Sequence, residues 1–150
     1  RRVGTNIGSL QWWVEAMMPE AERLKQKLEP PDVEEWNRRV QKMRLFDQLI
    51  CNVDRHSNNI LITKDWDLRL IDHSRSFRPV NELREPEKLT RFSKALLEGL
   101  EKLEYTDVKK KTGRYLTDPQ IRSMFKRRDA ILALAKAAVA ARGEAAVIYP

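Results

Sequence analysis

The sequence has very little of what several common classes of protein require. Its 150 residues include a single cysteine, Cys51, which excludes an intramolecular disulfide framework and an all-cysteine zinc site. Lys or Arg interrupts every apolar run before it reaches the roughly 20 residues of a membrane span, so we predict no transmembrane segment. The chain begins with neither Met nor a signal-type apolar core, which predicts a processed or excised fragment. One cysteine suits a reducing compartment, and we expect the cytoplasm.

What the sequence does contain is typical of a folded domain. Hydrophobic residues make up 41% and charged residues 34%, which supplies enough apolar area to offset the entropy of ordering the chain. The 29 Lys and Arg exceed the 22 Asp and Glu, giving a net charge of +7. The length fits one compact domain over residues 1–150. We divide it into an entry segment (1–31), a central segment (32–77) and a helical subdomain (78–150).

Apolar spacing predicts a mainly α fold. Asp32 is a suitable N-cap, and the apolar residues after it recur at steps of three and four, which places them on one face of a helix over 33–50. These positions are Val33, Trp36, Val40, Met43, Phe46 and Ile50. A second set at helical spacing predicts a helix over 89–103; its members are Leu89, Phe92, Leu96, Leu100 and Leu103.

Two further elements follow from local signals. Residues 60–63 and 68–71 are short β-prone runs on either side of a turn, and they predict a small hairpin. Thr117-Asp118-Pro119 is a helix-start signature, and the Ala-rich helix that it opens is expected to run to Gly143.

Three polar residues around the hairpin have the chemistry of a phosphate-handling site. Asp54 lies in the loop after the first helix, Asn59 follows five residues later, and Asp72 stands thirteen residues beyond, where the second strand ends. The hairpin brings these positions towards one another. Mg²⁺ prefers oxygen ligands, so one Asn and one Asp are a suitable protein contribution. The remaining Asp is then available to orient or deprotonate an attacking hydroxyl.

The pattern Asp54-Arg55-His56-x-x-Asn59, followed by Ile71-Asp72, resembles the catalytic loop and metal-binding segment of the protein-kinase-like superfamily. The Arg-His after the Asp is similar to the atypical branch, namely the phosphatidylinositol 3/4-kinases and the secretory-pathway (four-jointed-like) kinases with their bacterial relatives. The resemblance implies a phosphotransferase with Asp54 as the catalytic residue and ATP as the donor. It also implies that Asn59 and Asp72 are ligands of Mg²⁺ or Mn²⁺.

The same resemblance assigns supporting roles. Arg55 and His56 would support the catalytic loop, Arg55 by pairing with a local carboxylate or carbonyl and His56 by packing or a hydrogen bond. Gly8, Ser9 and Gln11 would lie near the adenine, just past the hinge between two lobes. The implied fold is the C-terminal lobe of the kinase-like (α+β) fold.

The N-terminal lobe of that fold has no counterpart in the sequence. No Gly-rich phosphate loop and no strand Lys precede residue 33, and Gly4 and Gly8 are not followed by Gly-Lys-Ser/Thr, so a P-loop is excluded. We therefore expect an N-terminal lobe of the same protein as a partner, without which this chain would be inactive. The hydroxyl-bearing acceptor is not identified by the sequence.

Other interpretations remain open. Asp and Asn are ordinary turn and cap residues, and His73-Ser74 stands where conventional kinases have Phe-Gly. Residues 104–128 hold eight basic side chains against three acidic ones, most simply a solvated or ion-paired face that includes Arg127 and Arg128. That charge also fits a basic helical module that binds nucleic acid or another anion. A third alternative is a catalytically silent kinase-like scaffold.

Overall fold

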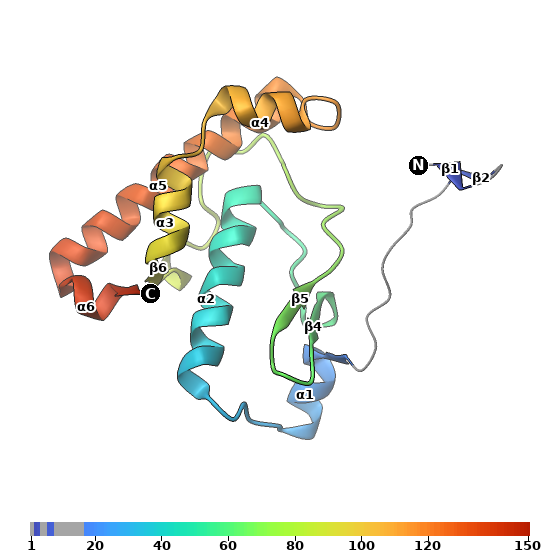
Figure 1. Cartoon of the computed structure of the whole chain (residues 1–150), viewed down its shortest axis with the longest axis vertical. Helices are drawn as coiled ribbons and strands as arrows, with labels where there is room; N and C mark the ends of the chain where they lie inside the picture. The colour runs from blue at the N-terminus through green and yellow to red at the C-terminus, as the bar shows by residue number, and fades with distance from the viewer. Residues whose placement is uncertain (1, 4–5, 8–16) are drawn as a thin grey trace.

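The computed structural model describes residues 2–3, 6–7 and 17–150, and it is mainly helical with a small antiparallel sheet, as the sequence predicts (Figure 1). The helices are α1 (Glu20–Gln26), α2 (Val33–Ile50), α3 (Lys94–Glu101), α4 (Tyr105–Thr112), α5 (Asp118–Arg142) and α6 (Glu144–Val147). The strands are β1 (Arg2–Val3), β2 (Asn6–Ile7), β3 (Met18–Pro19), β4 (Ile60–Ile62), β5 (Leu68–Leu70), β6 (Phe92–Ser93) and β7 (Ile148–Tyr149). Short 3₁₀ turns cover Ser57–Asn59 and Pro86–Lys88.

Helix α2 has the predicted bounds, but its apolar face is only partly buried. Asp32 caps it, since its Oδ1 accepts a hydrogen bond from the backbone N of Glu35 at 2.9 Å. Two residues of the apolar face, Val33 and Phe46, are 56% and 40% exposed. The buried residues are Leu45, Asp47 and Ile50. Leu45 packs in the core with residues of α5 and β6, whereas Asp47 is buried against Arg55.

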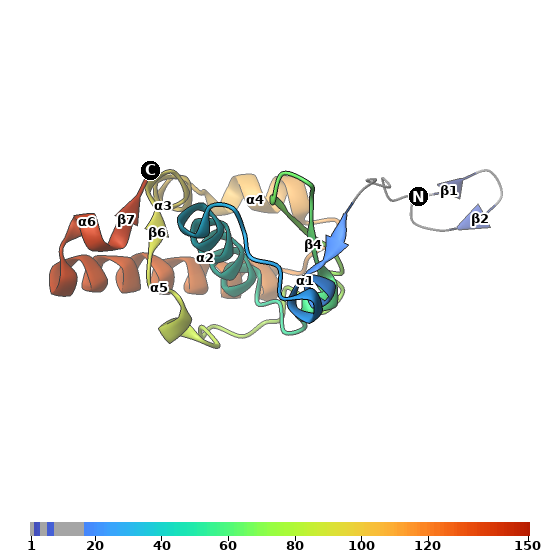
Figure 2. The ribbon, with the colours of Figure 1, turned by 90° about the horizontal axis from the view of Figure 1, so that it is seen from below.

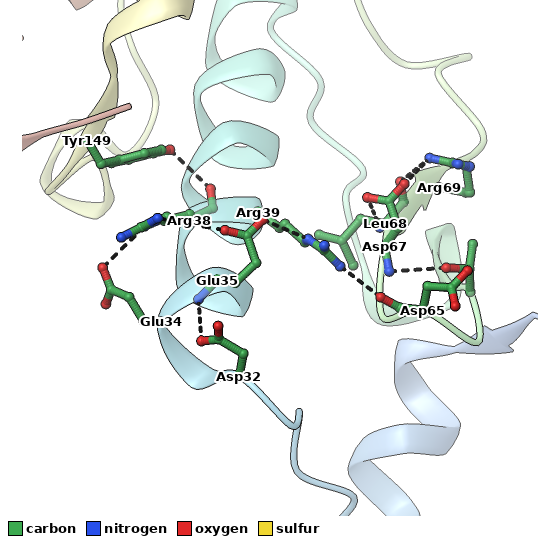
Figure 3. Close-up of polar contacts among 11 residues, drawn as sticks. Asp32, Glu34, Glu35, Arg38, Arg39, Asp65, Asp67, Leu68, Arg69 and Tyr149 are labelled. Atoms are coloured by element: carbon green, nitrogen blue, oxygen red, sulfur yellow. Dashed lines mark hydrogen bonds and ion pairs between the residues drawn. The ribbon is translucent and has the colours of Figure 1, made fainter.

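The predicted hairpin is confirmed and lies within a three-stranded sheet in the order β3–β4–β5. Antiparallel pairing sets Ile60 opposite Leu70 and Ile62 opposite Leu68. Strand β3, which the sequence analysis did not predict, pairs with the other edge of β4. The hairpin turn is attached to α2, because Arg39 Nη1 donates to the carbonyl of Asp65 at 3.1 Å (Figure 3).

The C-terminal helix begins and ends where the sequence predicts. Thr117 donates its backbone N–H to Gln120 Oε1 at 2.8 Å, and Pro119 lies in the first turn of α5. Gly143, with a φ of 83°, ends the helix, and such a positive φ favours glycine. Helix α2 lies beside α5 on one side and faces the β4–β5 hairpin on the other (Figure 1). Figure 2 shows α2 and α3 on the same side of α5.

The helix predicted over 89–103 is wrong in its first part. Helix α3 begins only at Lys94, while Phe92 and Ser93 form strand β6, which pairs in parallel with β7 at the C-terminus. Phe92 is fully buried there. Its backbone therefore bonds to a strand more than fifty residues away in the chain, which helical spacing within one segment cannot reveal. The basic stretch after α3 forms helix α4, which was not predicted.

The main core lies where α2, α3, α5 and the β6–β7 pair meet. Its buried members are Leu45, Leu89, Phe92, Leu100, Ile131, Ala135 and Val147. Because these residues come from both halves of the chain, the core joins the predicted central segment to the helical subdomain. Among the described helices, none is long and apolar enough to cross a bilayer.

The expectation of a solvated Arg127 is wrong. This side chain is 1% exposed, and it donates to the carbonyl oxygens of Leu49 at 3.0 Å, Arg78 at 3.3 Å and Val80. Burial lowers the pKa of its guanidinium. Arg127 therefore fastens α5 to the end of α2 and to the loop over 78–80, and it takes no part in a surface charge cluster.

Candidate functional site

The candidate site lies at the end of the hairpin where α2, the following loop and strand β5 come together. The backbone N of Ile71 donates to the carbonyl of Asn59 at 3.2 Å, which continues the β4–β5 pairing by one position. Asn59 thus lies opposite Ile71, and Asp72 follows directly. The hairpin therefore brings the loop that begins at Asp54 and the segment that begins at Asp72 to one end of the sheet.

Arg55 connects these segments from the inside. Its Nε and Nη2 lie 2.9 and 3.0 Å from the two carboxylate oxygens of Asp47, and its Nη1 lies 2.8 Å from the carbonyl oxygens of both Asn59 and Ile71. The side chains of Arg55 and Asp47 are 8% and 10% exposed. The expected pairing of Arg55 with a carboxylate and with carbonyls is confirmed.

Asp47 and Asn52 also hold the loop, and the sequence analysis gave neither a role. Asn52 Nδ2 donates to Asp47 Oδ1 at 3.0 Å, and Asn52 Oδ1 accepts from the backbone N of Asp54 at 3.1 Å. Both residues are buried. The signal that could have revealed Asp47 is an acidic residue close to Leu45 and Ile50 on the helix, because a buried carboxylate needs a cationic partner.

Asp54 is a half-buried carboxylate on a fixed backbone. Its side chain is 32% exposed, and its backbone carbonyl accepts a hydrogen bond from Asn59 Nδ2 at 3.1 Å. Arg75, which the sequence analysis did not single out, places its Nε 3.6 Å from Asp54 Oδ2. The carboxylate therefore faces a side chain that is 63% exposed, and it borders solvent.

Asp72 is held in an ionised, outward-facing form. Its Oδ1 accepts from Ser74 Oγ at 2.6 Å and from the backbone N of Ser74 at 3.2 Å. These hydrogen bonds lower the pKa of the Asp72 carboxyl, and the nearby positive charge of Arg75 lowers it further. Arg75, which pairs with Asp54, follows Asp72 by three residues in the chain.

Asn59, the third predicted site residue, is buried at 6% exposure between them in the chain. Its amide nitrogen is committed to the Asp54 carbonyl, so Oδ1 is the atom of this side chain that suits a cation. An amide oxygen and a carboxylate are hard ligands, and Mg²⁺ is commonly bound by one or two carboxylates together with phosphate oxygens and water. In the described ranges, no group of three or more His, Cys, Asp or Glu side chains is placed to hold a metal ion.

The two histidines have different surroundings. Exposed His56 accepts a hydrogen bond at Nδ1 from the backbone N of Asn58 at 3.3 Å, which braces the 3₁₀ turn before β4. His73 Nε2 lies 3.1 Å from Arg55 Nη2 and must accept, because a guanidinium can only donate. Burial and the charge of Arg55 lower the pKa of His73.

Gly8, Ser9 and Gln11, which the resemblance places near the adenine, lie outside the described residues. A comparison of the chain with known protein families finds no match, and a comparison with curated proteins finds none. Function is therefore inferred from the residues and their contacts.

Proposed function

We propose that this chain is the C-terminal lobe of an atypical kinase-like phosphotransferase that transfers the γ-phosphoryl group of ATP to a hydroxyl. The observation that carries the proposal is geometric: Arg55 bonds to the carbonyls of Asn59 and Ile71, and Asn59 bonds to the Asp54 backbone, so the loop of Asp54 and the segment of Asp72 meet at one end of the hairpin. Turn and cap functions alone would not require a buried Asn and two accessible carboxylates at the same end of a sheet.

Asp54 is the residue proposed to act on the acceptor. Its carboxylate is partly exposed, and its backbone is fixed on both sides, since Asp54 N donates to Asn52 Oδ1 and the Asp54 carbonyl accepts from Asn59 Nδ2. In the proposed step the acceptor oxygen forms a bond to the γ-phosphorus, and the bond to the bridging oxygen breaks. ADP leaves with that electron pair, and Asp54 takes the hydroxyl proton. Asp54 thereby orients the hydroxyl and removes its proton.

Asn59 and Asp72 are the residues that would hold Mg²⁺ or Mn²⁺, which when bound neutralises charge on the phosphates. The lowered pKa of Asp72 keeps its carboxylate ionised at neutral pH, as a ligand must be. Arg75 supplies a positive charge in the same region. Since its contact with Asp54 is an exposed ion pair worth at most about 1 kcal/mol, the side chain can move aside at little cost.

The buried network explains how such a site would stay ordered. Arg55 follows Asp54 in the chain and bonds to Asp47 of α2, to the carbonyl of Asn59 and to the carbonyl of Ile71, the residue before Asp72. Catalysis of phosphoryl transfer depends mainly on positioning and charge, so a rigid support contributes directly to rate. An N-terminal lobe of the same protein is the proposed source of the remaining nucleotide contacts.

The decisive experiment measures phosphoryl transfer from ATP by a protein that contains these residues together with its N-terminal lobe. Asp54→Asn and Asp72→Asn should each lower turnover by about 100-fold or more. Asp65→Asn, which changes an exposed acid in the hairpin turn, is the matched control and should retain full turnover. Unchanged turnover in either site variant would refute the assignment.

Metal binding can be tested on this chain without any assay of activity. Mn²⁺ is paramagnetic and should broaden the NMR signals of Asn59 and Asp72 at concentrations that leave those of Asp65 sharp. Asp72→Asn should abolish the selective broadening. Broadening that follows exposed carboxylates in general would argue against a site at Asn59 and Asp72.

A further inference from the structure

A basic pocket of about 340 Å³ adjoins the catalytic loop. One wall is the C-terminal half of α2, another is the loop that includes Asn52, Val53 and Arg55, and the third is the segment over 84–88. Val53 and Arg55 flank Asp54 in the chain. A volume of this size is in the range of small-molecule sites. The pocket therefore lies next to the proposed catalytic residue without including it.

The third wall is fastened to α2. Gln48 Oε1 accepts a hydrogen bond from the backbone N of Arg84 at 2.8 Å. Farther along, Arg44 Nη1 lies 3.4 Å from the carbonyl of Lys88. These contacts position the segment over 84–88 through its backbone. The guanidinium of Arg84 is not needed for that attachment.

The pocket carries an excess of positive charge. Its lining includes four cationic side chains and two carboxylates. Asp47 pairs with Arg55, and Glu85 pairs with Lys88. Within residues 17–150, Arg44 and Arg84 form no ion pair with a carboxylate.

The cations of the pocket affect the pKa of Glu85. Its pKa is lowered, first by the hydrogen bond from Lys88 and then by the charges of Lys88, Arg84 and Arg44. A single carboxylate thus has three cations around it. The charge balance leaves two guanidinium groups to bind an anion from outside the chain.

We propose that this pocket binds a phosphate monoester, with Arg44 and Arg84 as the principal contacts. A phosphate monoester carries between one and two negative charges at neutral pH and offers three acceptor oxygens, which match the planar, forked donors of arginine. Because the pocket adjoins the loop of Asp54, the bound phosphate is the anionic end of the hydroxyl acceptor. That last clause rests on the proposed function, whereas the binding itself does not.

Two probes with the same chemical group test the binding. Glycerol 3-phosphate presents the monoester in solution, and phosphatidic acid presents it on phosphatidylcholine vesicles. The whole chain is titrated with each, by calorimetry and by co-sedimentation, without ATP or divalent ions. Arg44→Gln and Arg84→Gln should each weaken binding by about tenfold, the loss expected for one charged hydrogen-bond donor. Exposed Arg122, on α5, supplies the matched control, and Arg122→Gln should bind as the unmodified chain does.

The results distinguish a soluble phosphate ester from a lipid headgroup, and a specific site from non-specific binding. Binding of both probes identifies a soluble ligand, and binding of the vesicles alone identifies a lipid headgroup; both support the pocket when the two arginine variants are selectively weakened. Equal weakening by Arg122→Gln means attraction to net charge, and no binding of either probe means no site, so either result overturns the inference. Arg84→Gln keeps the attachment to Gln48, so its folding is preserved.

The same titration is repeated with Asp54→Asn to keep the two proposals apart. This variant should bind glycerol 3-phosphate as the unmodified chain does, even though phosphoryl transfer is lost. Intact transfer together with absent phosphate binding would refute the pocket alone. Intact binding together with unaffected transfer in Asp54→Asn would refute the catalytic assignment alone.

Discussion

The guanidinium of Arg55 lies against the carboxylate of Asp47 in a two-point contact, with Nε 2.9 Å from Oδ2 and Nη2 3.0 Å from Oδ1. Eight residues separate the pair in the chain, and both side chains are at most 10% exposed. Through Nη1, Arg55 also bonds to the carbonyls of Asn59 and Ile71. The side chain of Arg55 thus connects the C-terminal part of α2 with the residue before β4 and the residue after β5.

Removal of one partner of this pair should be strongly destabilising. Asp47→Ala leaves the Arg55 charge buried without its counter-ion, and we expect the free energy of unfolding to fall by about 3–5 kcal/mol. The double variant Asp47→Ala with Arg55→Met should lose less than the sum of the two single variants, because no charge remains buried. Urea denaturation of the four proteins measures this coupling.

The exposed pair of Arg69 and Asp67 provides the comparison for that experiment. Its side chains are 53% and 43% exposed, so Arg69→Ala should cost at most about 1 kcal/mol. A loss for Asp47→Ala no larger than that of Arg69→Ala would show that the buried pair does not hold the loop.

Phe92 should be among the most sensitive core positions. It is fully buried in strand β6, and Phe92→Ala is expected to cost about 3–5 kcal/mol through lost burial and a residual cavity. Leu24→Ala changes a side chain that is 54% exposed and should remain within about 0.5 kcal/mol of the unmodified chain. Thermal and urea unfolding distinguish them, and similar losses at both positions would contradict the assigned core.

Tyr149 should make stability fall at alkaline pH. Burial raises the pKa of its phenol from 10.0 to about 12, against the opposing charges of Arg91 and Arg38. Its hydroxyl donates to the carbonyl of Arg38 at 3.1 Å (Figure 3). Below pH 10 the phenol makes its full contribution to the free energy of unfolding. Between pH 10.0 and about 12 the unfolded phenol loses its proton while the folded one keeps it, so stability decreases as the pH rises.

Ultraviolet absorbance of the phenolate measures that titration directly. Tyr149→Phe should remove the late-titrating signal, whereas Tyr115→Phe, at an 80% exposed position, should leave it in place. A late signal that survives Tyr149→Phe would belong to another group and would refute this assignment.

The basic face of α4 and α5 should bind nucleic acid only weakly and without sequence preference. Lys109 pairs with Asp118, Arg128 with Asp129, and Arg127 is buried, so fewer cations remain available than the sequence suggests. We expect binding of duplex DNA that is detectable at about 50 mM salt and is lost by about 200 mM. Filter binding over that range tests the alternative function.

A tight complex that persists at the higher salt would contradict this expectation and favour a nucleic-acid-binding module. In that case a variant with Lys110, Lys111 and Arg122 replaced by Gln should reduce the slope of affinity against salt, because those side chains are exposed.

Much of the local structure can be predicted from the sequence because the interactions that define it span only a few residues. The Asp32 cap, the start of α5 at Thr117-Asp118-Pro119 and the β4–β5 hairpin are examples, and each depends on neighbours within about one turn or one hairpin. The positions of Asp54, Asn59 and Asp72 around that hairpin follow from the same signals. Their catalytic and metal-binding roles stay predictions.

What the tertiary structure decided concerns burial and partners. Periodicity shows that α2 has an apolar face, but Leu45 is buried in the core with residues of α5 and β6, and Asp47 is buried against Arg55, while Val33 and Phe46 are exposed. A charged residue such as Arg127 is expected to face solvent, yet its guanidinium donates to three backbone carbonyl groups. Whether a side chain is buried, and which group satisfies it, depends on segments distant in the chain, and these meet only when the whole domain has folded.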